Sequence, residues 1–315
     1  EDEGQLFVSC AGGVRTEATY TVDEEKLPEG FSTFNLVVKG LTGGHSGDDI
    51  NKKRANANKL LVRFLWEQSE KTDLRLCDIQ AGGLHNAIPR EAHATVAVPT
   101  AYVATFGEEL QAFVEKVRDE FSATEPDLTA VIEPVAAAPT CICKEQAERL
   151  LKSLNVVHNG IFAMSQDLEG LVETSSNLAS VRKHGNQIVA TTSQRSSVAS
   201  NLEYMASVVR SAFELGGAKC VTNEGYPGWK MNPKSEILKV CVDSYKRLFG
   251  KEPLVRAIHA GLECGLFSEK YPHLDMVSFG PTLRGVHSPD ERLLIPTVQM
   301  VWDHLLDVLK NVPEK

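Results

Sequence analysis

Apolar residues recur every three or four positions in several stretches of the chain, the spacing that places them on one face of an α-helix. This pattern predicts helices over residues 51–68, 106–122, 200–215, 233–249 and 262–270, and a last one from about Thr297. Near the start of the third helix, Ser200 and Glu203 have the spacing of a capping box. We therefore expect Ser200 to be the N-cap of that helix.

Short runs rich in β-branched and alternating apolar residues lie between these helices and predict strands. They cover residues 5–10, 14–22, 32–40, 73–80, 92–98, 128–135, 177–183, 187–193, 218–222, 254–258 and 274–279. Pairs of strands alternate with helices up to residue 223, which is typical of α+β units with helices on one face of a sheet. The order strand-strand-helix-strand over 14–80 and again over 177–222 suggests a duplicated unit.

The pattern changes after residue 223, where helices and strands alternate singly, as in the closing half of an α/β domain. Pro227, Gly228 and Trp229 predict a break in the chain at this point. We expect the strand at 5–10 to join this last part of the chain, which makes the middle of the chain an insertion.

Composition and charge exclude some classes of function. The 315 residues carry a formal net charge of −9, so wide binding to the phosphates of nucleic acid is not expected. The basic stretch Lys52-Lys53-Arg54 is interpreted as a solvated face. No apolar run is long enough to cross a bilayer, and no secretory segment is recognisable.

Seven cysteines are scattered along the chain, an odd number without a repeated pair spacing. Cys141 and Cys143 form a C-x-C, not the C-x-x-C of a zinc ribbon or a redox site. We interpret all seven as reduced thiols, which predicts a cytoplasmic protein.

Four clusters of polar residues beside glycine or proline are candidates for chemistry, at 43–48, 82–90, 259–265 and 280–291. Loops at strand ends place side chains in open clefts, although a lone histidine or a Gly-Gly pair is more often structural. Nucleophilic catalysis by Cys264, with His259 near it in sequence, stays open as an alternative. Spacing alone does not name a reaction.

Six motifs in order along the chain resemble peptidase family M20, and most closely its aminoacyl-histidine dipeptidase branch. They are GGHSG (43–47), GGLHNAIPR (82–90), LEGLVETSSNLA (168–179), SQRSS (193–197), HAGLECG (259–265) and GVHSPDER (285–292). The resemblance implies a partial α/β catalytic domain, residues 1–12 and 224–315, interrupted by an α+β lid and dimerisation domain at 13–223. It also implies a homodimer, because lid domains of this family commonly pair.

The resemblance further implies hydrolysis of Xaa-His and related dipeptides at a site with two zinc ions, or cobalt or manganese in their place. His287 would be one metal ligand. The remaining ligands and the general base are expected upstream of Glu1, so this chain alone is expected to be inactive.

For the substrate, the resemblance implies that His45 stabilises the oxyanion and that Arg195 binds the C-terminal carboxylate in a bidentate fork. Asn86 is expected to bind the same end of the substrate, and the backbone of Gly261 and Leu262 to line the pocket. For two more candidate residues, two interpretations stay open. Glu263 contacts a cationic side chain or caps the following helix, and His259 contacts substrate or supports its neighbours.

Two other functions fit the same resemblance. One is a different substrate on the same fold, either an N-acyl amino acid or a tripeptide. The other is a non-catalytic dimerisation or binding module.

Overall fold

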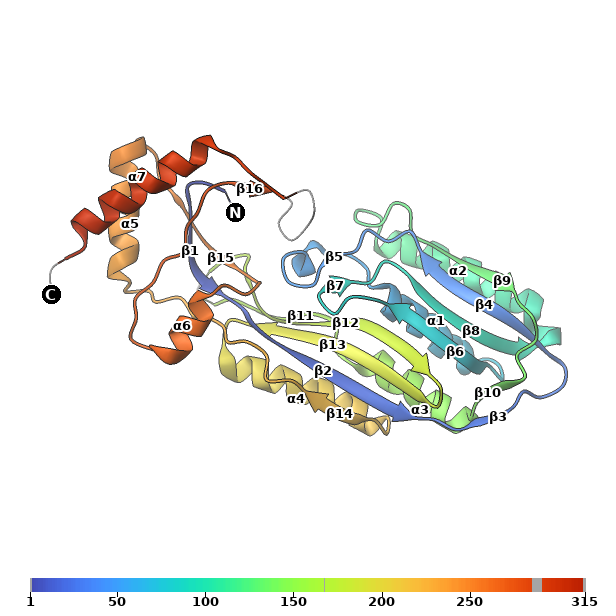
Figure 1. Cartoon of the computed structure of the whole chain (residues 1–315). Coiled ribbons are helices and arrows are strands. Elements are labelled where there is room, and N and C mark those ends of the chain that lie inside the picture. Colours follow the sequence, from blue (N-terminus) through green and yellow to red (C-terminus); the bar gives the residue numbers. More distant parts are fainter. Residues whose placement is uncertain (1, 167, 285–290, 314–315) are drawn as a thin grey trace.

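The computed structural model describes residues 2–166, 168–284 and 291–313. Figure 1 shows a large sheet with helices along one side and, at one end of it, a smaller group of helices and strands. We call residues 12–222 the large unit. The small unit consists of the first strand, β1 (Gln5–Cys10), and residues 229–313.

The large unit is built from two copies of a β-α-β-β-α-β arrangement, each with its strands in the spatial order second, third, first, fourth. The first repeat is β4 (Phe31–Lys39), α1 (Ala57–Ser69), β6 (Arg75–Gly82), β8 (Ala92–Pro99), α2 (Val103–Glu120) and β9 (Thr129–Pro134). The second repeat is β2 (Gly12–Thr21), α3 (Lys144–Val156), β12 (Val172–His184), β13 (Gln187–Ser196), α4 (Ala199–Leu215) and β14 (Lys219–Thr222).

The two repeats join edge to edge in one antiparallel sheet, because β6 pairs with β12 through Val181 opposite Ala81. The duplication predicted from the sequence exists, but its members were assigned wrongly. Strand β2 belongs to the second repeat, and the whole first repeat is inserted between it and α3. Local patterns do not reveal this, since β2 pairs with β13 about 175 residues later in the chain.

Smaller strands complete the large unit. β11 (Gly160–Met164) pairs with β12, and β3 (Glu24–Lys26) pairs with β10 (Thr140–Ile142). β5 (Gly44–His45) pairs with β7 (Ala87–Ile88), which ties two of the candidate loops together. Two 3₁₀ turns lie at Ile50–Lys52 and Thr100–Tyr102.

The main hydrophobic core of the large unit lies between the sheet and helices α1 to α4. Phe64 of α1 is almost completely buried and packs its ring 5.4 Å from Phe106 and 5.2 Å from Phe113. In the second repeat, Tyr20 meets Phe213 edge to face at 6.4 Å. With the helices on one face, the opposite face of the sheet is left for the candidate loops.

The small unit is organised around β1, which runs parallel to β15 (Leu254–Ile258). This pairing confirms that the first strand joins the last part of the chain. The helices are α5 (Glu236–Phe249), α6 (Cys264–Lys270) and α7 (Pro296–Asn311), and β16 (Leu283–Arg284) pairs antiparallel with β17 (Arg292–Leu293). The strand predicted at 274–279 is wrong, because only Ser278 forms a bridge there, with Phe7.

Helix ends differ from the prediction where a side-chain cap decides them. Helix α1 begins only at Ala57, because the Asn56 side chain accepts a hydrogen bond from the backbone N–H of Lys59. The capping box at Ser200 is wrong: Val198 is the N-cap of α4, with no side-chain cap hydrogen bond. Helix α3 was missed, although Ala147, Leu150 and Leu154 have helical spacing.

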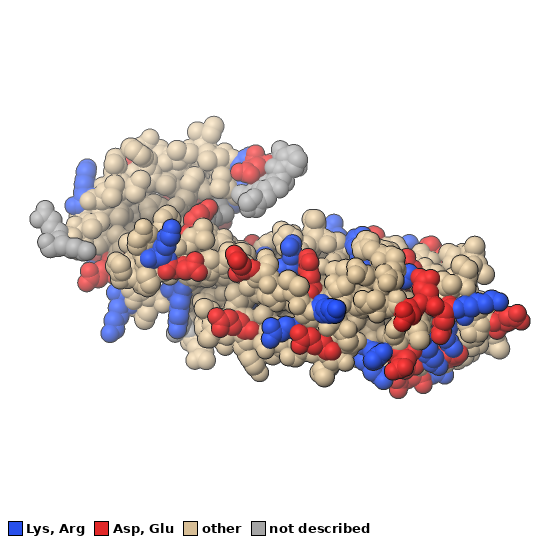
Figure 2. Space-filling model, turned by 60° about the horizontal axis from the view of Figure 1, so that its bottom comes forward, with Lys and Arg blue, Asp and Glu red and all other residues tan. Residues whose placement is uncertain are grey.

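Charges of both signs lie close together at the end of the large unit far from the small unit (Figure 2). Arg75 contacts Asp73 and Glu25 there, at 3.0 and 2.5 Å, and Lys183 lies 2.6 Å from Glu24. This end is therefore a network of ion pairs and not a basic face. Among the described residues, no helix is both long and apolar enough to cross a membrane.

Candidate active site

The loop that carries His45 is held in place by hydrogen bonds at its base. His45 donates its backbone N–H to Asp49 Oδ2 at 2.7 Å, and Arg54 lies 3.2 Å from the same oxygen. Gly44, at φ +141°, passes so close to Arg54 and Asp49 that a Cβ atom would clash with them. The glycine-rich sequence therefore allows the backbone to approach these charged groups.

The ring of His45 has a defined orientation. Its Nδ1 accepts hydrogen bonds from the backbone N–H of Gly47 at 3.2 Å and of Asp48 at 3.1 Å. A neutral ring that accepts at Nδ1 carries its proton on Nε2. His45 is thus set up to donate a hydrogen bond from Nε2.

His259 follows β15 and is 6% exposed. Its Nε2 lies 2.7 Å from Ser175 Oγ on β12, and its Nδ1 has no hydrogen-bond partner among the described residues. Burial, and after it the charge of Arg195, lower the pKa of His259 to about 3, against a smaller opposing effect of a hydrogen bond with the Val172 backbone. The imidazole is therefore neutral at physiological pH.

Arg195 lies on β13, opposite Ser175 and Gly13 on the neighbouring strands. The residue is 7% exposed, and its Nη1 donates to the hydroxyl oxygen of Tyr226 at 2.6 Å. Arg195 Nε has no hydrogen-bond partner within the described parts of the chain. A buried guanidinium with an unused donor is costly, which indicates a place for an anion.

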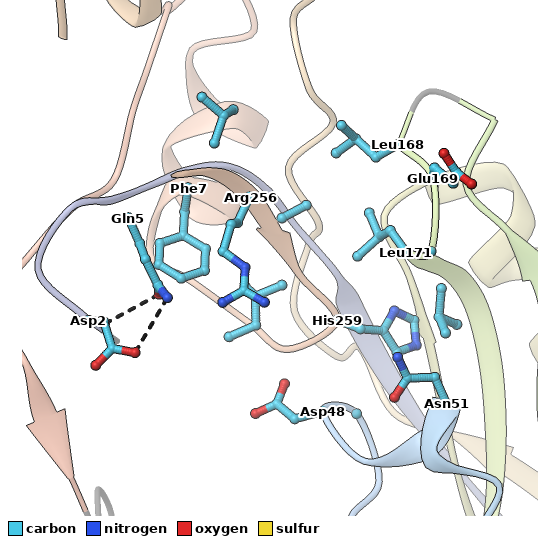
Figure 3. A pocket seen from close by; sticks show the side chains of 16 residues that line it. Asp2, Gln5, Phe7, Asp48, Asn51, Leu168, Glu169, Leu171, Arg256 and His259 are labelled. Carbon is cyan, nitrogen blue, oxygen red and sulfur yellow. Dashed lines mark hydrogen bonds between the residues drawn. The ribbon is translucent and has the colours of Figure 1, made fainter. Parts of the chain in front are cut away.

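These groups come from three parts of the fold and lie near one another, since Arg195 and His45 both act on the pKa of His259. The loop after His45 reaches the small unit, because a Cβ atom on Gly47 would overlap the backbone oxygen of His259. A pocket of about 520 Å³ opens beside them, lined by Gly47, Asp48 and His259 together with β1 and β15. Figure 3 shows the His259 ring and the Asp48 carboxylate at this pocket.

The other predicted substrate residues lie around the same region. Asn86 is exposed, and its backbone oxygen accepts the N–H of Ser46 at 2.9 Å, next to His45. Gly261 packs against the ring of Tyr226, and the backbone oxygen of Leu262 faces Cys10 Sγ at 3.8 Å. Glu263 is exposed at the N-cap of α6, but its side chain makes no cap hydrogen bond.

The metal site is not formed by the described residues alone. His287, the predicted ligand, lies outside them. Elsewhere in 2–313, as far as the structure describes it, no three His, Cys, Asp or Glu side chains cluster in a way that could hold a metal ion. The described residues thus do not offer a ligand set for a metal ion.

The comparisons with known proteins agree with this geometry. Residues 29–127 match the family model of the M20 peptidase dimerisation domain. The chain is 40% identical over all 315 residues to the cytosol non-specific dipeptidase of Escherichia coli (strain K12). The crystal structure of the aminoacylhistidine dipeptidase from Vibrio alginolyticus superimposes on all of this chain with a TM-score of 0.95 at 41% identity.

The whole chain is thus similar to members of peptidase family M20, and residues 29–127 match the dimerisation domain of that family. It spans 65% of the length of the Escherichia coli relative and 64% of the Vibrio structure. The fold expected from the sequence, part of an α/β catalytic domain with an inserted α+β dimerisation domain, is confirmed by the likeness to the Vibrio structure and by the family model.

Sequence reasoning missed several residues that shape this candidate site. Ser175 and Tyr226 contact His259 and Arg195, and Asp49 and Glu125 hold the loop of His45. Ser175 lies within one of the quoted motifs, and Tyr226 stands between two glycines near the predicted boundary. Their roles depend on partners far away in sequence, so no local signal distinguishes them.

Proposed function

We propose that this chain forms the lid and the substrate-binding side of a metal-dependent dipeptidase that hydrolyses Xaa-His and related dipeptides. The observation that carries the proposal is that His45 and Arg195 both lie near enough to His259 to act on its pKa, while Arg195 Nε and His259 Nδ1 lack a hydrogen-bond partner among the described residues. Both named relatives are dipeptidases, and each matches this chain over all of its 315 residues.

We propose a role for each residue. His45, with its ring proton on Nε2, donates to the oxygen on which negative charge develops during peptide hydrolysis. Arg195 binds the C-terminal carboxylate of the dipeptide through Nε and the second guanidinium nitrogen. Asn86 contacts the same end of the substrate, and the backbone of Gly261 and Leu262 lines the pocket.

His259 and Glu263 have less direct roles. His259 stays neutral and helps to line the pocket, while Ser175 fixes its ring. Glu263 can attract a cationic or imidazole side chain, because it is exposed and makes no cap hydrogen bond of its own. This supports the substrate role of Glu263 over the capping role.

The cofactor we propose is zinc, two ions per complete site, with cobalt or manganese as substitutes. His287 is the proposed ligand from this chain. The lid is proposed to span residues 13–223, and residues 1–12 and 224–315 to belong to the catalytic domain. We place the protein in the cytoplasm, which the seven cysteines and the name of the cytosolic relative support.

A homodimer is also proposed, supported by the match to a dimerisation domain. The edge of β6 is already paired with β12, so the dimer would use another surface, such as the outer edge of β9. Light scattering should give twice the mass of one chain. A mass equal to one chain would contradict the dimer. The pairing of the two repeats within one chain would then take the place of a pairing between two chains.

Hydrolysis assays test the proposed activity. The protein, as its gene encodes it, should cleave glycyl-histidine faster than acetyl-histidine or a tripeptide, and a metal chelator should abolish the activity. Faster cleavage of acetyl-histidine or the tripeptide would favour the deacylase or tripeptidase. Activity that resists chelators but is lost on alkylation would favour catalysis by Cys264, and no hydrolysis at all would favour the binding module.

A further inference from the structure

Tyr226 is attached to the large unit at the point where the chain leaves it. Its backbone exchanges two hydrogen bonds with Gly13 of β2, each 2.9 Å long. Gly225, at φ +71°, makes this possible, because a Cβ atom there would overlap the backbone oxygen of Gly13. The position of the Tyr226 backbone is therefore fixed relative to β2.

Two glycines also hold the ring of Tyr226. A Cβ atom on Gly13 would lie 2.7 Å from the Tyr226 hydroxyl oxygen, and one on Gly261 would lie 2.8 Å from the ring carbon Cε2. Both distances are shorter than real contacts, so the ring fits only because these two residues have no side chain. The phenol is thereby held between a strand of the large unit and the loop that follows His259.

The hydroxyl group of Tyr226 contacts Arg195, which lies on β13, the strand next to β2. Arg195 Nη1 donates to it at 2.6 Å, while Arg195 Nε has no partner among the described residues. Both residues line a pocket of about 190 Å³, together with His85 and Ser193. None of the described residues that line this pocket is an aspartate or a glutamate.

We propose that Tyr226 determines specificity for a free C-terminal carboxylate, because it fixes the Arg195 guanidinium and offers its own hydroxyl proton to the same anion. The inference rests on the proposed function, in which Arg195 binds the carboxylate of the dipeptide. It adds a residue that no motif assigns, in a pocket that takes a small carboxylate.

The chemistry of the pair supports both parts of this role. Because the Tyr226 oxygen accepts the hydrogen bond from Arg195, its own proton points elsewhere and can be donated. Burial raises the pKa of Tyr226, against the opposing effect of Arg195, so the phenol keeps its proton at neutral pH. Because the Tyr226 hydroxyl is neutral, it does not neutralise the Arg195 guanidinium. The positive charge of Arg195 is then available to the anionic ligand.

The test compares an acid with its amide. The probe is glycyl-histidine with its peptide bond reduced to a methylene-amine, in a free-acid form and a C-terminal amide form. Calorimetry on the protein as its gene encodes it should show that Tyr226→Phe binds the acid roughly tenfold more weakly than the wild type. The affinity for the amide should stay within about twofold, since the phenylalanine ring keeps the packing against both glycines.

Two further variants separate the possible outcomes. Tyr20→Phe removes a buried hydroxyl that contacts Ser153 at 2.7 Å in the core, and it should change neither affinity. Arg195→Gln should abolish the preference for the acid. If Arg195→Gln abolishes that preference but Tyr226→Phe leaves it unchanged, the inference about Tyr226 is overturned and the proposed function stands.

If Arg195→Gln keeps the preference, or the wild type shows none, the carboxylate site itself is wrong and the inference is overturned with it. A thermal melt of each variant checks that it is folded. Weaker binding of acid and amide alike by Tyr226→Phe would also overturn the inference, since it would indicate a purely structural role for the hydroxyl group.

Discussion

The hydrogen bonds around His45 decide which of its ring nitrogens can donate. Two backbone N–H groups occupy Nδ1, which leaves the ring proton on Nε2. We predict that His45→Ala lowers kcat by roughly 10² to 10³-fold, the usual effect of removing one oxyanion donor, without loss of bound metal. Steady-state kinetics and metal analysis of the same sample measure both quantities.

His93→Ala is the matched control, because His93 is a partly exposed residue of β8 whose side chain lies 3.7 Å from Glu91. It should leave kcat unchanged. Equal loss of kcat and of metal in the His45 variant would contradict the oxyanion role, because it would indicate a collapsed site.

His259 makes stability depend on pH. Its pKa falls from an ordinary 6.5 to about 3 in the folded state, first because of burial and then because of Arg195. The unfolded state therefore binds more protons between these values, and the free energy of unfolding falls as pH is lowered through this window. The slope due to this residue is at most about 1.4 kcal/mol per pH unit.

We predict that His259→Gln makes urea unfolding less dependent on pH between pH 6.5 and about 3 than it is in the wild type. Midpoints and slopes of urea curves at several pH values measure the difference. An unchanged pH dependence would show that the imidazole is not buried as neutral histidine.

Which site residues are visible in the sequence depends on where their partners lie. His45 and Arg195 stand in motifs that identify the family, so the resemblance found them. Ser175 is hydrogen-bonded to His259, 84 residues later in the chain, and Tyr226 accepts a hydrogen bond from Arg195, 31 residues earlier. Such partners become visible only when strand pairing is known.

The loop at 42–55, which carries His45, is closed by a buried carboxylate from the turn after α2. Glu125 is 2% exposed and accepts the backbone N–H of Thr42 at 2.6 Å and of Ala55 at 2.8 Å. One side chain thus satisfies both ends of the loop. Glu125→Ala would leave two N–H groups at the loop ends without a partner.

We predict that Glu125→Ala lowers the free energy of unfolding by about 3 kcal/mol, the cost of two lost hydrogen bonds to a charged group. Urea denaturation measures the change. Glu145→Ala on the surface of α3, where the ion pair with Arg149 spans 3.9 Å, should cost less than about 0.5 kcal/mol. Similar values for the two variants would contradict this role of Glu125.

At the level of elements, the periodic pattern predicted most helices and strands but not their ends. Asn56 and Ser235 cap α1 and α5 with their side chains, and both helices begin several residues later than the apolar pattern suggested. The N-cap predicted at Ser200 is wrong because this helix begins earlier than predicted, not later. Helix α4 starts at Ala199, so Ser200 lies inside its first turn.

The whole molecule brings together groups from both repeats and from the small unit. His45 comes from the first repeat, Arg195 from the second, and His259 from the small unit, and the Gly47 backbone touches that of His259 within one chain. The alternation of elements predicted the fold class. The interleaving of the repeats was not predictable, because it depends on the junction between β6 and β12.

The central claim is that one chain supplies all three of these groups to one site. Two variants, His45→Ala and Arg195→Gln, are produced separately and also together, with different affinity tags, so that mixed oligomers can be isolated. Glycyl-histidine hydrolysis is measured for each preparation. The account predicts that each variant is strongly impaired and that mixed oligomers are no more active than the average of the two. Recovery of a substantial part of wild-type activity in the mixed oligomers would contradict it, because His45 would then act on the site of a partner.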